Sequence, residues 1–257
     1  MNKLIIWPYK MGSVSARKLA QELQCKRVFS NGRYHPKDNH IIINWGNSVD
    51  SSWYYDNDNF RLLNNTVNVR WASNKLIAFE NMADDGVSIP EWTTDIDIVK
   101  EWLLEENKVF ARTLLNSSGG KGIIILDGTN EIINAPLYTI NTKAKYEYRV
   151  HVAGGEMIDV QQKKQRREFT NERHGLIRNK ANGWVFCREQ VSVLDCVIEE
   201  SIKAVNALGL DFGAVDIGYN SYCNKAYVYE VNTSPGIEGT TLQKYVQYLK
   251  RKLTYDV

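Results

Sequence analysis

Two carboxylates and one amide near the carboxyl terminus have the residue types and the spacing of a metal site. Asp216 lies in an apolar run at 212–219, and Glu230 and Asn232 lie at the end of a second run that starts at 226. Two such runs joined by a short polar segment predict a β-hairpin. Because side chains alternate between the faces of a strand, Glu230 and Asn232 would point the same way, and Asp216 could join them from the paired strand.

These three oxygen ligands suit Mg²⁺, which takes one or two carboxylates and is usually completed by waters and substrate phosphates. The segment that follows, 233–239, contains Pro235 and Gly236. These residues predict a tight loop whose backbone amides could face an anion. For the hairpin alone, the alternative is that the acids face solvent and that the loop is an ordinary turn.

A second candidate is the glycine-rich loop between two predicted strands, 108–112 and 123–126. Its small residues would let backbone N–H groups approach phosphates closely, and Lys121 could add a positive charge. It is not a P-loop, because no Gly-x-x-x-x-Gly-Lys-Ser/Thr sequence opens a helix there. An ordinary hairpin with glycines at its turn is the alternative.

The segment 164–184 is the most basic of the chain, and it follows a predicted strand at 156–163. It could be a solvated loop, or it could line a channel for phosphates or an acidic substrate. With Phe169 and Trp184 among its cations it could also bind single-stranded nucleic acid, which the slight overall charge disfavours.

The elements that must position these residues follow from local patterns. Strands at 3–7, 26–29 and 41–44 around a helix at 13–23 predict a small open α/β domain. In a predicted strand at 146–152, Glu147, Arg149 and His151 share one face. An irregular surface loop is expected at 48–59. Further helices are expected to begin within 60–65, to cover 73–82, 96–105 after Asp95 and 192–208 with Ser192 as its cap, and to run from Thr240 or Thr241 to near Lys252.

Composition narrows the protein class. The 257 residues are 43% hydrophobic and 24% charged, which is ordinary for a globular protein. The net charge of +2 is too small to indicate nucleic acid as a binding partner. The four cysteines are scattered, and no apolar run approaches the length of a membrane span. The N-terminal stretch at 1–8 is too short for a signal peptide, so we expect a cytoplasmic protein. No serine-hydrolase elbow or nucleophilic triad is evident.

The motifs, taken in order over roughly 73–257, resemble those of the ATP-grasp carboxylate-amine ligases. The Glu-Val-Asn-Thr-Ser-Pro-Gly segment at 230–236 is the most specific of them. The chain is most similar to the ribosomal-protein glutamate ligase branch and is also similar to D-alanine:D-alanine ligase. The resemblance implies an N-terminal α/β domain at 1–72, a lid subdomain at 73–138 and a C-terminal antiparallel-sheet core at 139–257.

The resemblance also implies roles for individual residues. Arg112 stands where the family usually has a lysine, and the adenine-contacting segment at 136–140 lacks the usual glutamate. Arginine keeps the charge and can grip phosphate bidentately, so the role could survive the change. The implied nucleotide ligands are Lys75, Arg112, Gly119, Gly120, Lys121, Gly122, Tyr138, Thr139, Ile140 and Glu147. The implied catalytic residues are Arg149, Lys163, Arg178 and Asn179, and the implied metal ligands are Asp216, Glu230 and Asn232.

The activity implied is ATP-dependent joining of a carboxylate to an amine through an acyl phosphate, with release of ADP and phosphate. The cofactors would be ATP and Mg²⁺, with two ions expected and Mn²⁺ as a substitute. The substrates would be a small molecule, a peptide or a protein, and neither a membrane nor a nucleic acid is expected as a partner. A nucleotide-binding module without ligase activity, with a regulatory or scaffold role, is the alternative.

Overall fold

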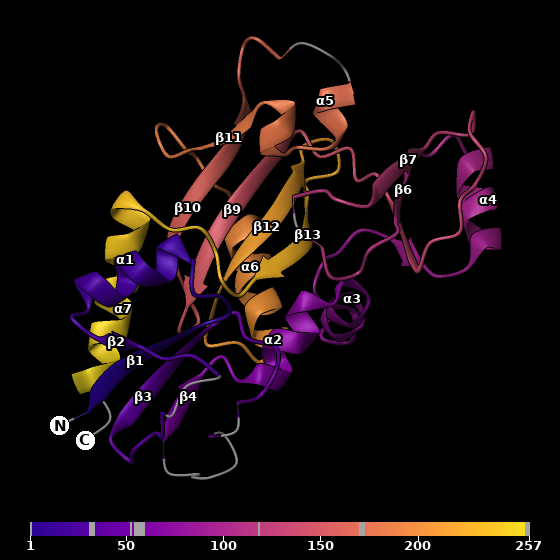
Figure 1. Ribbon diagram of the computed structural model, residues 1–257. Helices are drawn as coiled ribbons and strands as arrows, with labels where there is room; N and C mark the ends of the chain where they lie inside the picture. The colour runs from indigo at the N-terminus through magenta and orange to yellow at the C-terminus, as the bar shows by residue number, and fades with distance from the viewer. Residues whose placement is uncertain are drawn as a thin grey trace.

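The computed structural model of the chain describes residues 2–30, 34–51, 53, 60–117, 119–169 and 173–254. Three β-sheets with helices packed on them make up this part of the chain (Figure 1). One sheet is parallel and two are antiparallel, so the prediction of a mixed α/β and α+β architecture is confirmed. The irregular loop predicted at 48–59 lies mostly outside the described residues.

The N-terminal sheet is parallel and is covered by helices from both ends of the chain. Its strand β3 is apolar almost throughout and fully buried, as is typical of a strand inside a parallel sheet. The helices α1 and α7 pack against each other, and their apolar faces share one core with β1 and β3. In spatial order the strands are β2 (Lys26–Arg27), β1 (Lys3–Pro8), β3 (His40–Trp45) and β4 (Arg61–Leu63), and the helices are α1 (Val14–Glu22) and α7 (Gly239–Thr254).

The prediction that a helix begins within 60–65 is wrong. This segment forms the edge strand β4, in which Leu62 and Leu63 pair in parallel with the middle of β3. The next helix, α2 (Thr66–Ser73), begins only after Asn65, whose side chain caps its first turn. The pairing partner lies about twenty residues away in the chain, so local periodicity could not reveal the strand.

A second, antiparallel sheet has four strands and projects from the rest of the chain in Figure 1; together with α4 it is called the lid below. The lid has its own small core, which includes Val99, Val109 and Tyr138. Asp95 caps the lid helix by accepting a hydrogen bond from the Asp97 amide, as predicted. The lid elements are β5 (Trp92–Thr93), β8 (Leu137–Ile140), β6 (Val109–Arg112), β7 (Ile123–Leu126) and α4 (Ile96–Leu104).

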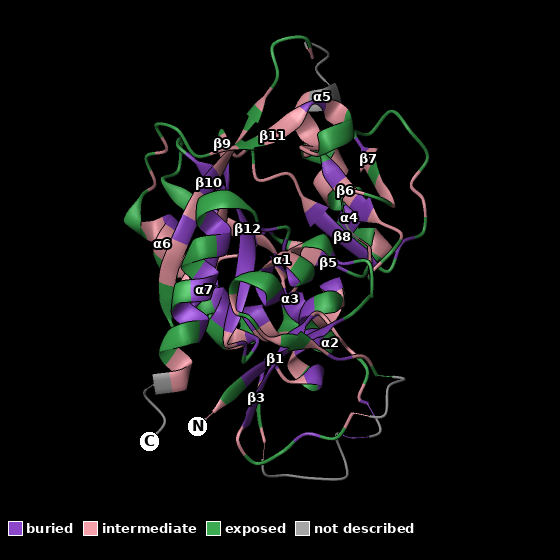
Figure 2. Cartoon of the chain, turned by 60° about the vertical axis from the view of Figure 1, so that its left-hand side comes forward, coloured by how far each residue is buried: buried purple, intermediate pink, exposed green. Residues whose placement is uncertain are grey.

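The central sheet has five antiparallel strands, and every residue of its strand β12 is buried (Figure 2). The helices α2, α3 and α6 pack on one face and share its apolar core. In spatial order the strands are β11 (Trp184–Cys187), β10 (Glu156–Gln165), β9 (Tyr146–Ala153), β12 (Phe212–Asn220) and β13 (Lys225–Asn232), and the helices nearby are α3 (Lys75–Asp84), α5 (Arg173–Leu176), α6 (Asp195–Ala207) and the 3₁₀ turn η2 (Lys180–Asn182).

Ser192 does not cap α6, contrary to the prediction. The capping position is Leu194, which makes no side-chain capping bond, and Asp195 in the first turn provides the favourable negative charge. The carbonyl of Ser192 instead accepts a hydrogen bond of 3.3 Å from the Tyr148 hydroxyl. Ser192 therefore fixes the segment before the helix to the central sheet.

One buried asparagine joins the N-terminal sheet to the central sheet. Asn64 is fully buried and adopts a positive φ of 58° directly after β4. Its amide oxygen accepts from the backbone N–H groups of Asp211 and Phe212, and its amide nitrogen donates to the Phe212 carbonyl. The Asp211 carboxylate accepts from the Asn64 backbone at 2.7 Å.

In the described part of the chain, every helix is too short or too polar to span a membrane.

Candidate active site

A cavity of about 950 Å³ lies where the lid, the central sheet and the N-terminal domain meet. The lid contributes residues of β6, β8 and the glycine-rich loop, and the central sheet contributes side chains from all five strands. The start of α1 and the loop 236–238 close the end opposite the lid. Each part of the chain therefore supplies part of one site.

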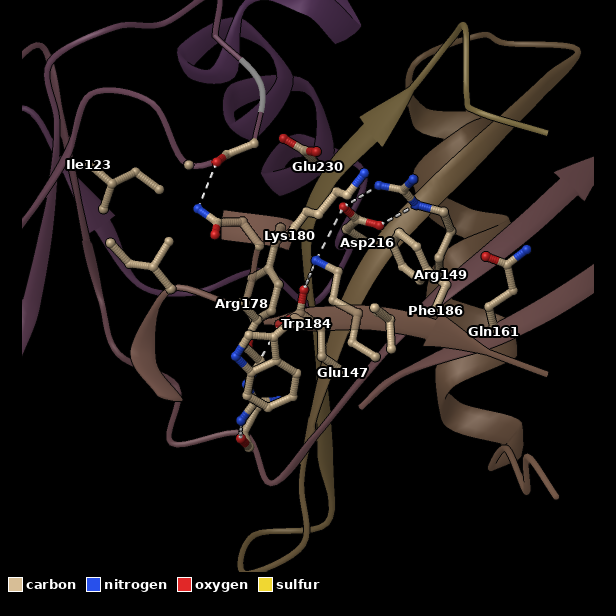
Figure 3. A pocket seen from close by; sticks show the side chains of 18 of the residues that line it. Ile123, Glu147, Arg149, Gln161, Arg178, Lys180, Trp184, Phe186, Asp216 and Glu230 are labelled. Carbon is tan, nitrogen blue, oxygen red and sulfur yellow. Dashed lines mark hydrogen bonds and ion pairs between the residues drawn. The ribbon is translucent and has the colours of Figure 1, made fainter. Parts of the chain in front are cut away.

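The register of the central sheet places Arg149, Asp216 and Glu230 in one row across three strands. Asp216 on β12 pairs with Arg149 on β9 and with Glu230 on β13. The Arg149 guanidinium holds both carboxylate oxygens of Asp216, at 2.7 and 2.8 Å (Figure 3). Asn232 lies one alternate position beyond Glu230 and donates to its carboxylate at 3.1 Å.

A β-bulge shapes this corner. The pairing shifts between Asp216 and Ile217, so that Tyr229 is an extra residue on β13. Both Tyr229 and its neighbour Glu230 consequently line the cavity, although successive residues of a regular strand would face opposite ways. The Tyr229 hydroxyl forms a 2.6 Å hydrogen bond with Thr142, just beyond the end of β8.

A second row lies next to the first. The Lys163 ammonium forms an ion pair with Glu147 and lies 3.7 Å from Asp216. Burial raises the pKa of Glu147, although Lys163 opposes this. Burial also acts to raise the pKa of Asp216, but Arg149 and Lys163 outweigh it and hold that pKa well below its ordinary value. The site therefore contains a carboxylate that stays ionised in a buried position.

The edge strand β11 lays two aromatic rings over these cations. Phe186 lies 4.3 Å from the Arg149 guanidinium and 5.5 Å from the Lys163 ammonium. Trp184 covers the guanidinium of Arg178 at 4.9 Å (Figure 3). Such contacts hold a cation over a ring face. The alternation of Trp184, Phe186 and Arg188 in the sequence was the available signal that these residues share a face.

At the lid end, buried cations lie beside Asp216 and Glu230, which together are called the acid row. Arg112 at the end of β6 lines the cavity, and its Nε has no hydrogen-bond partner among the described residues. Burial lowers the pKa of Arg112, and Glu230 opposes this change. Lys75 is buried at the start of α3 and donates to the Ser117 carbonyl of the glycine-rich loop. Burial lowers the pKa of Lys75, Glu230 opposes this, and Arg112 lowers it further.

The glycine-rich loop is tied to the basic segment that follows β10. Gly119, Gly120 and Gly122 all have positive φ, a conformation that favours glycine. Asn179 donates to the Gly119 carbonyl at 2.9 Å. A Cβ atom at Gly120 would lie 2.8 Å from the side chain of Ile177. The loop and the segment 177–180 therefore form one wall of the cavity.

Most of the site residues expected from the sequence lie together. Those that line the cavity are Arg112, Gly119, Gly120, Thr139, Ile140, Glu147, Arg149, Lys163, Arg178, Asn179, Asp216 and Glu230. The sequence interpretation missed Gln161, Lys180, Phe186 and Arg188, which also line it, and on the N-terminal side Ser15 and Lys18.

Solved structures of ATP-grasp ligases align with the whole chain. PsnB in complex with a minimal precursor has 12% sequence identity and a TM-score of 0.69, covering 98% of this chain and 99% of that one. D-alanine:D-alanine ligase from Bacillus anthracis has 12% identity and a TM-score of 0.65, with both chains fully covered. The macrocyclase MdnB from Microcystis aeruginosa has 13% identity and a TM-score of 0.63, covering 99% of this chain and all of that one. This chain has the ATP-grasp fold.

No protein-family model matches the sequence, and no curated protein matches it. The predicted resemblance to the ATP-grasp ligases is confirmed by the structural matches, which establish the fold. At this level of sequence identity the likeness establishes the architecture of the chain, and its chemistry has to be argued from the cavity.

Five residues expected at the nucleotide or the metal of this ATP-grasp fold do not line the cavity. One of them is Tyr138, whose side chain is fully buried in the lid core, where its hydroxyl bonds to the backbone of Ala135 and Ile133. Its backbone pairs on both sides, with β5 and with β6. The chain that lines the cavity continues beyond the strand, at 141–144. The other four are Lys75, Lys121, Gly122 and Asn232. Of these, Lys75 donates to the Ser117 carbonyl of the glycine-rich loop, and Asn232 donates to the Glu230 carboxylate, which lines the cavity.

The donor set at the acid row fits a hard divalent cation. Asp216 and Glu230 present carboxylate oxygens, and each oxygen has two acceptor positions, so the bond from Arg149 does not exhaust Asp216. Two carboxylates with room for waters and phosphate oxygens is the arrangement that Mg²⁺ prefers. No cluster of three or more His, Cys, Asp or Glu residues suited to a metal occurs in the described part of the chain.

Proposed function

We propose that this chain is an ATP-dependent ligase that joins a carboxylate to an amine. The observation that carries the proposal is the charge of the cavity. Eight lysine and arginine side chains line it against four carboxylates, and two of those carboxylates, Asp216 and Glu230, form the paired row. A chain with a net charge of only +2 thus concentrates its positive charge where a triphosphate and an acidic substrate would meet.

ATP would lie between the lid and the central sheet. Arg112 and the amides of the glycine-rich loop would contact its phosphates, with Lys75 behind that loop. Glu147 would contact the ribose, and the strand end at 139–144 would contact the adenine. Support comes from PsnB, which was solved with Mg, ADP and a variant of its minimal precursor.

Mg²⁺ would be held by Asp216 and Glu230, with Asn232 orienting Glu230. When bound, it would neutralise charge that develops on the transferred phosphoryl group. Two ions or Mn²⁺ in its place remain our expectation from the family. ATP and scattered thiols both favour action in the cytoplasm.

The reaction proposed has two steps. An oxygen of the substrate carboxylate attacks the γ-phosphorus of ATP, the bond to the bridging oxygen breaks, and ADP leaves. An amine nitrogen then attacks the acyl carbon, phosphate leaves, and the ammonium proton is lost to solvent. Arg149, Lys163 and Arg178 would stabilise the phosphoryl oxygens, and Asn179 would keep the glycine-rich loop closed against water.

The test is a substrate screen with two readouts. The purified chain is incubated with ATP, Mg²⁺ and pooled amino acids or peptides, and ADP is measured together with new amide products by mass spectrometry. We expect ADP release that depends on a substrate pool and that Lys163→Gln lowers by about 10²-fold or more. Nucleotide binding without any substrate-dependent ADP release would instead support a regulatory or scaffold module.

A further inference from the structure

We propose that the end of the cavity opposite the lid binds a second carboxylate of the substrate, one that does not react, and that Arg188 is its principal ligand. The inference rests on the proposed ligase function and narrows its substrate class to molecules with two carboxylates. It assigns a role to Arg188, Gln161 and Lys18, which the nucleotide and the metal do not use.

Arg188 is held by one hydroxyl group. Its Nε and Nη2 atoms donate to Thr241 Oγ1 at 3.3 and 2.8 Å. Gln161 donates to the same oxygen at 3.0 Å, and the Thr241 hydroxyl donates to Asp159. Thr241 is fully buried, so this arrangement fixes the plane of the guanidinium. Among the described residues Nη1 has no partner, the side chain is 36% exposed, and Arg188 lines the cavity.

The charges at this end leave one positive charge over. Arg188 lies 3.8 Å from Asp159, and Lys244 lies 3.2 Å from the same carboxylate. Lys18 on α1 lies 3.9 Å from Glu238, a carboxylate that is 75% exposed. Three cations therefore lie near two acids, of which Lys244 and Asp159 stand outside the cavity lining, and a single ligand carboxylate would balance the charge. An arginine whose guanidinium plane is fixed favours a planar carboxylate, to which it donates directional hydrogen bonds, over an anion that makes less directional contacts.

The sheet register sets the distance from this end to the reacting groups. Arg188 follows Cys187, whose partner is Gln162, so Arg188 lies beside Gln161. Gln161 in turn pairs with Arg149, which holds Asp216. Arg188 and Arg149 are thus two strand spacings apart, roughly 10 Å between backbones. Both side chains reach into the cavity, which leaves room for two carboxylates separated by a few carbon atoms.

The test compares two small probes that differ in one charge. Binding of glutarate and of its monoamide is measured by calorimetry with AMPPNP and Mg²⁺ present, for the wild type, Arg188→Gln and Arg188→Lys. We expect the wild type to prefer glutarate by about 10- to 100-fold, Arg188→Gln to lose this preference, and Arg188→Lys to keep part of it. Thermal unfolding checks that both variants are folded.

Two outcomes overturn the inference: equal binding of the probes to the wild type, which includes no binding of either, and a preference that survives in Arg188→Gln. AMPPNP affinity separates this result from the proposed function. We expect that affinity to be the same in all three proteins. A wild type that binds the dicarboxylate selectively but fails to bind AMPPNP would refute the ligase proposal and leave the anion site standing.

Discussion

At the scale of single residues, the site depends on charges that compensate each other in a buried row. Arg149, Asp216 and Glu230 are neighbours across three strands, and Lys163 joins them from a fourth. An acid removed from such a row leaves a buried cation without its partner, which is costly. Substitutions here must therefore be followed by both stability and binding.

Substitutions of Arg112 test whether this arginine makes the phosphate contact that a lysine usually makes at this position of the lid. Arg112→Gln should weaken AMPPNP binding about 10- to 100-fold, because a charge-assisted contact is lost, whereas Arg112→Lys should retain most of the affinity. Fluorescence or calorimetric titration measures the effect. Equal affinity in the wild type and in Arg112→Gln would remove Arg112 from the nucleotide site.

The low pKa of Asp216 predicts how stability depends on pH. A carboxyl group whose pKa is lower in the folded chain stabilises the fold above its unfolded value, and this contribution is lost as the pH falls through the folded value. Asp216→Asn should cost about 3–5 kcal/mol near neutrality, since Arg149 loses its partner. The difference between the proteins, measured by urea unfolding, should shrink below roughly pH 4. A difference that grows on acidification would contradict this assignment.

Sequence patterns located many of these residues but not all of their surroundings. Alternation correctly placed Glu147 and Arg149 on one face, and the hairpin correctly paired Asp216 with Glu230. The bulge at Tyr229 and the aromatic cover from Phe186 depend on pairing between distant strands, which a local pattern does not contain. The burial of the Tyr138 side chain in the lid core likewise depends on strands that are distant in the sequence, because β8 pairs with β5 and β6.

At the scale of elements, the glycine-rich loop and the segment after β10 act as one wall. Gly120 approaches Ile177 closely, and Asn179 bonds to Gly119. The sequence predicted both the loop and the strands around it, because turn glycines between apolar runs are a local signal. It could not predict which distant segment the loop would touch.

A pair of glycines in the lid separates backbone strain from function. Gly120 and Gly128 both have positive φ, but only Gly120 lines the cavity and would clash with a neighbour at 2.8 Å. Alanine at either position should cost about 1–2 kcal/mol of stability. Only Gly120→Ala should also lower nucleotide affinity, by about tenfold or more. Titration with AMPPNP checks this, and an equal loss in both variants would show that strain alone is responsible.

At the scale of the whole molecule, the cavity exists because three sheets are held in place against each other. The fold class could be predicted from motifs in family order, but the joins between sheets could not. Asn64 shows why: its partners Asp211 and Phe212 lie far along the chain, and its position after an unpredicted strand gave no signal.

Substitution of Asn64 should therefore lower the stability of the fold strongly, although this residue is remote from the acid row. Asn64→Gly keeps the positive φ accessible but removes the side-chain bonds, and it should cost about 2–3 kcal/mol by denaturant unfolding. Gln190→Gly is the matched control, because Gln190 also has positive φ but is exposed, and it should be nearly neutral. Equal stability of the two variants would mean that the join is unimportant.

The central claim is that the acid row holds Mg²⁺ and thereby the phosphates of ATP. The most direct measurement is the affinity of AMPPNP with and without Mg²⁺, for the wild type and for Glu230→Gln, which preserves the shape of the side chain. We predict that Mg²⁺ tightens binding to the wild type by about tenfold or more and that Glu230→Gln loses most of this gain. An affinity that is independent of Mg²⁺ in the wild type, or a gain that persists in the variant, would contradict the claim.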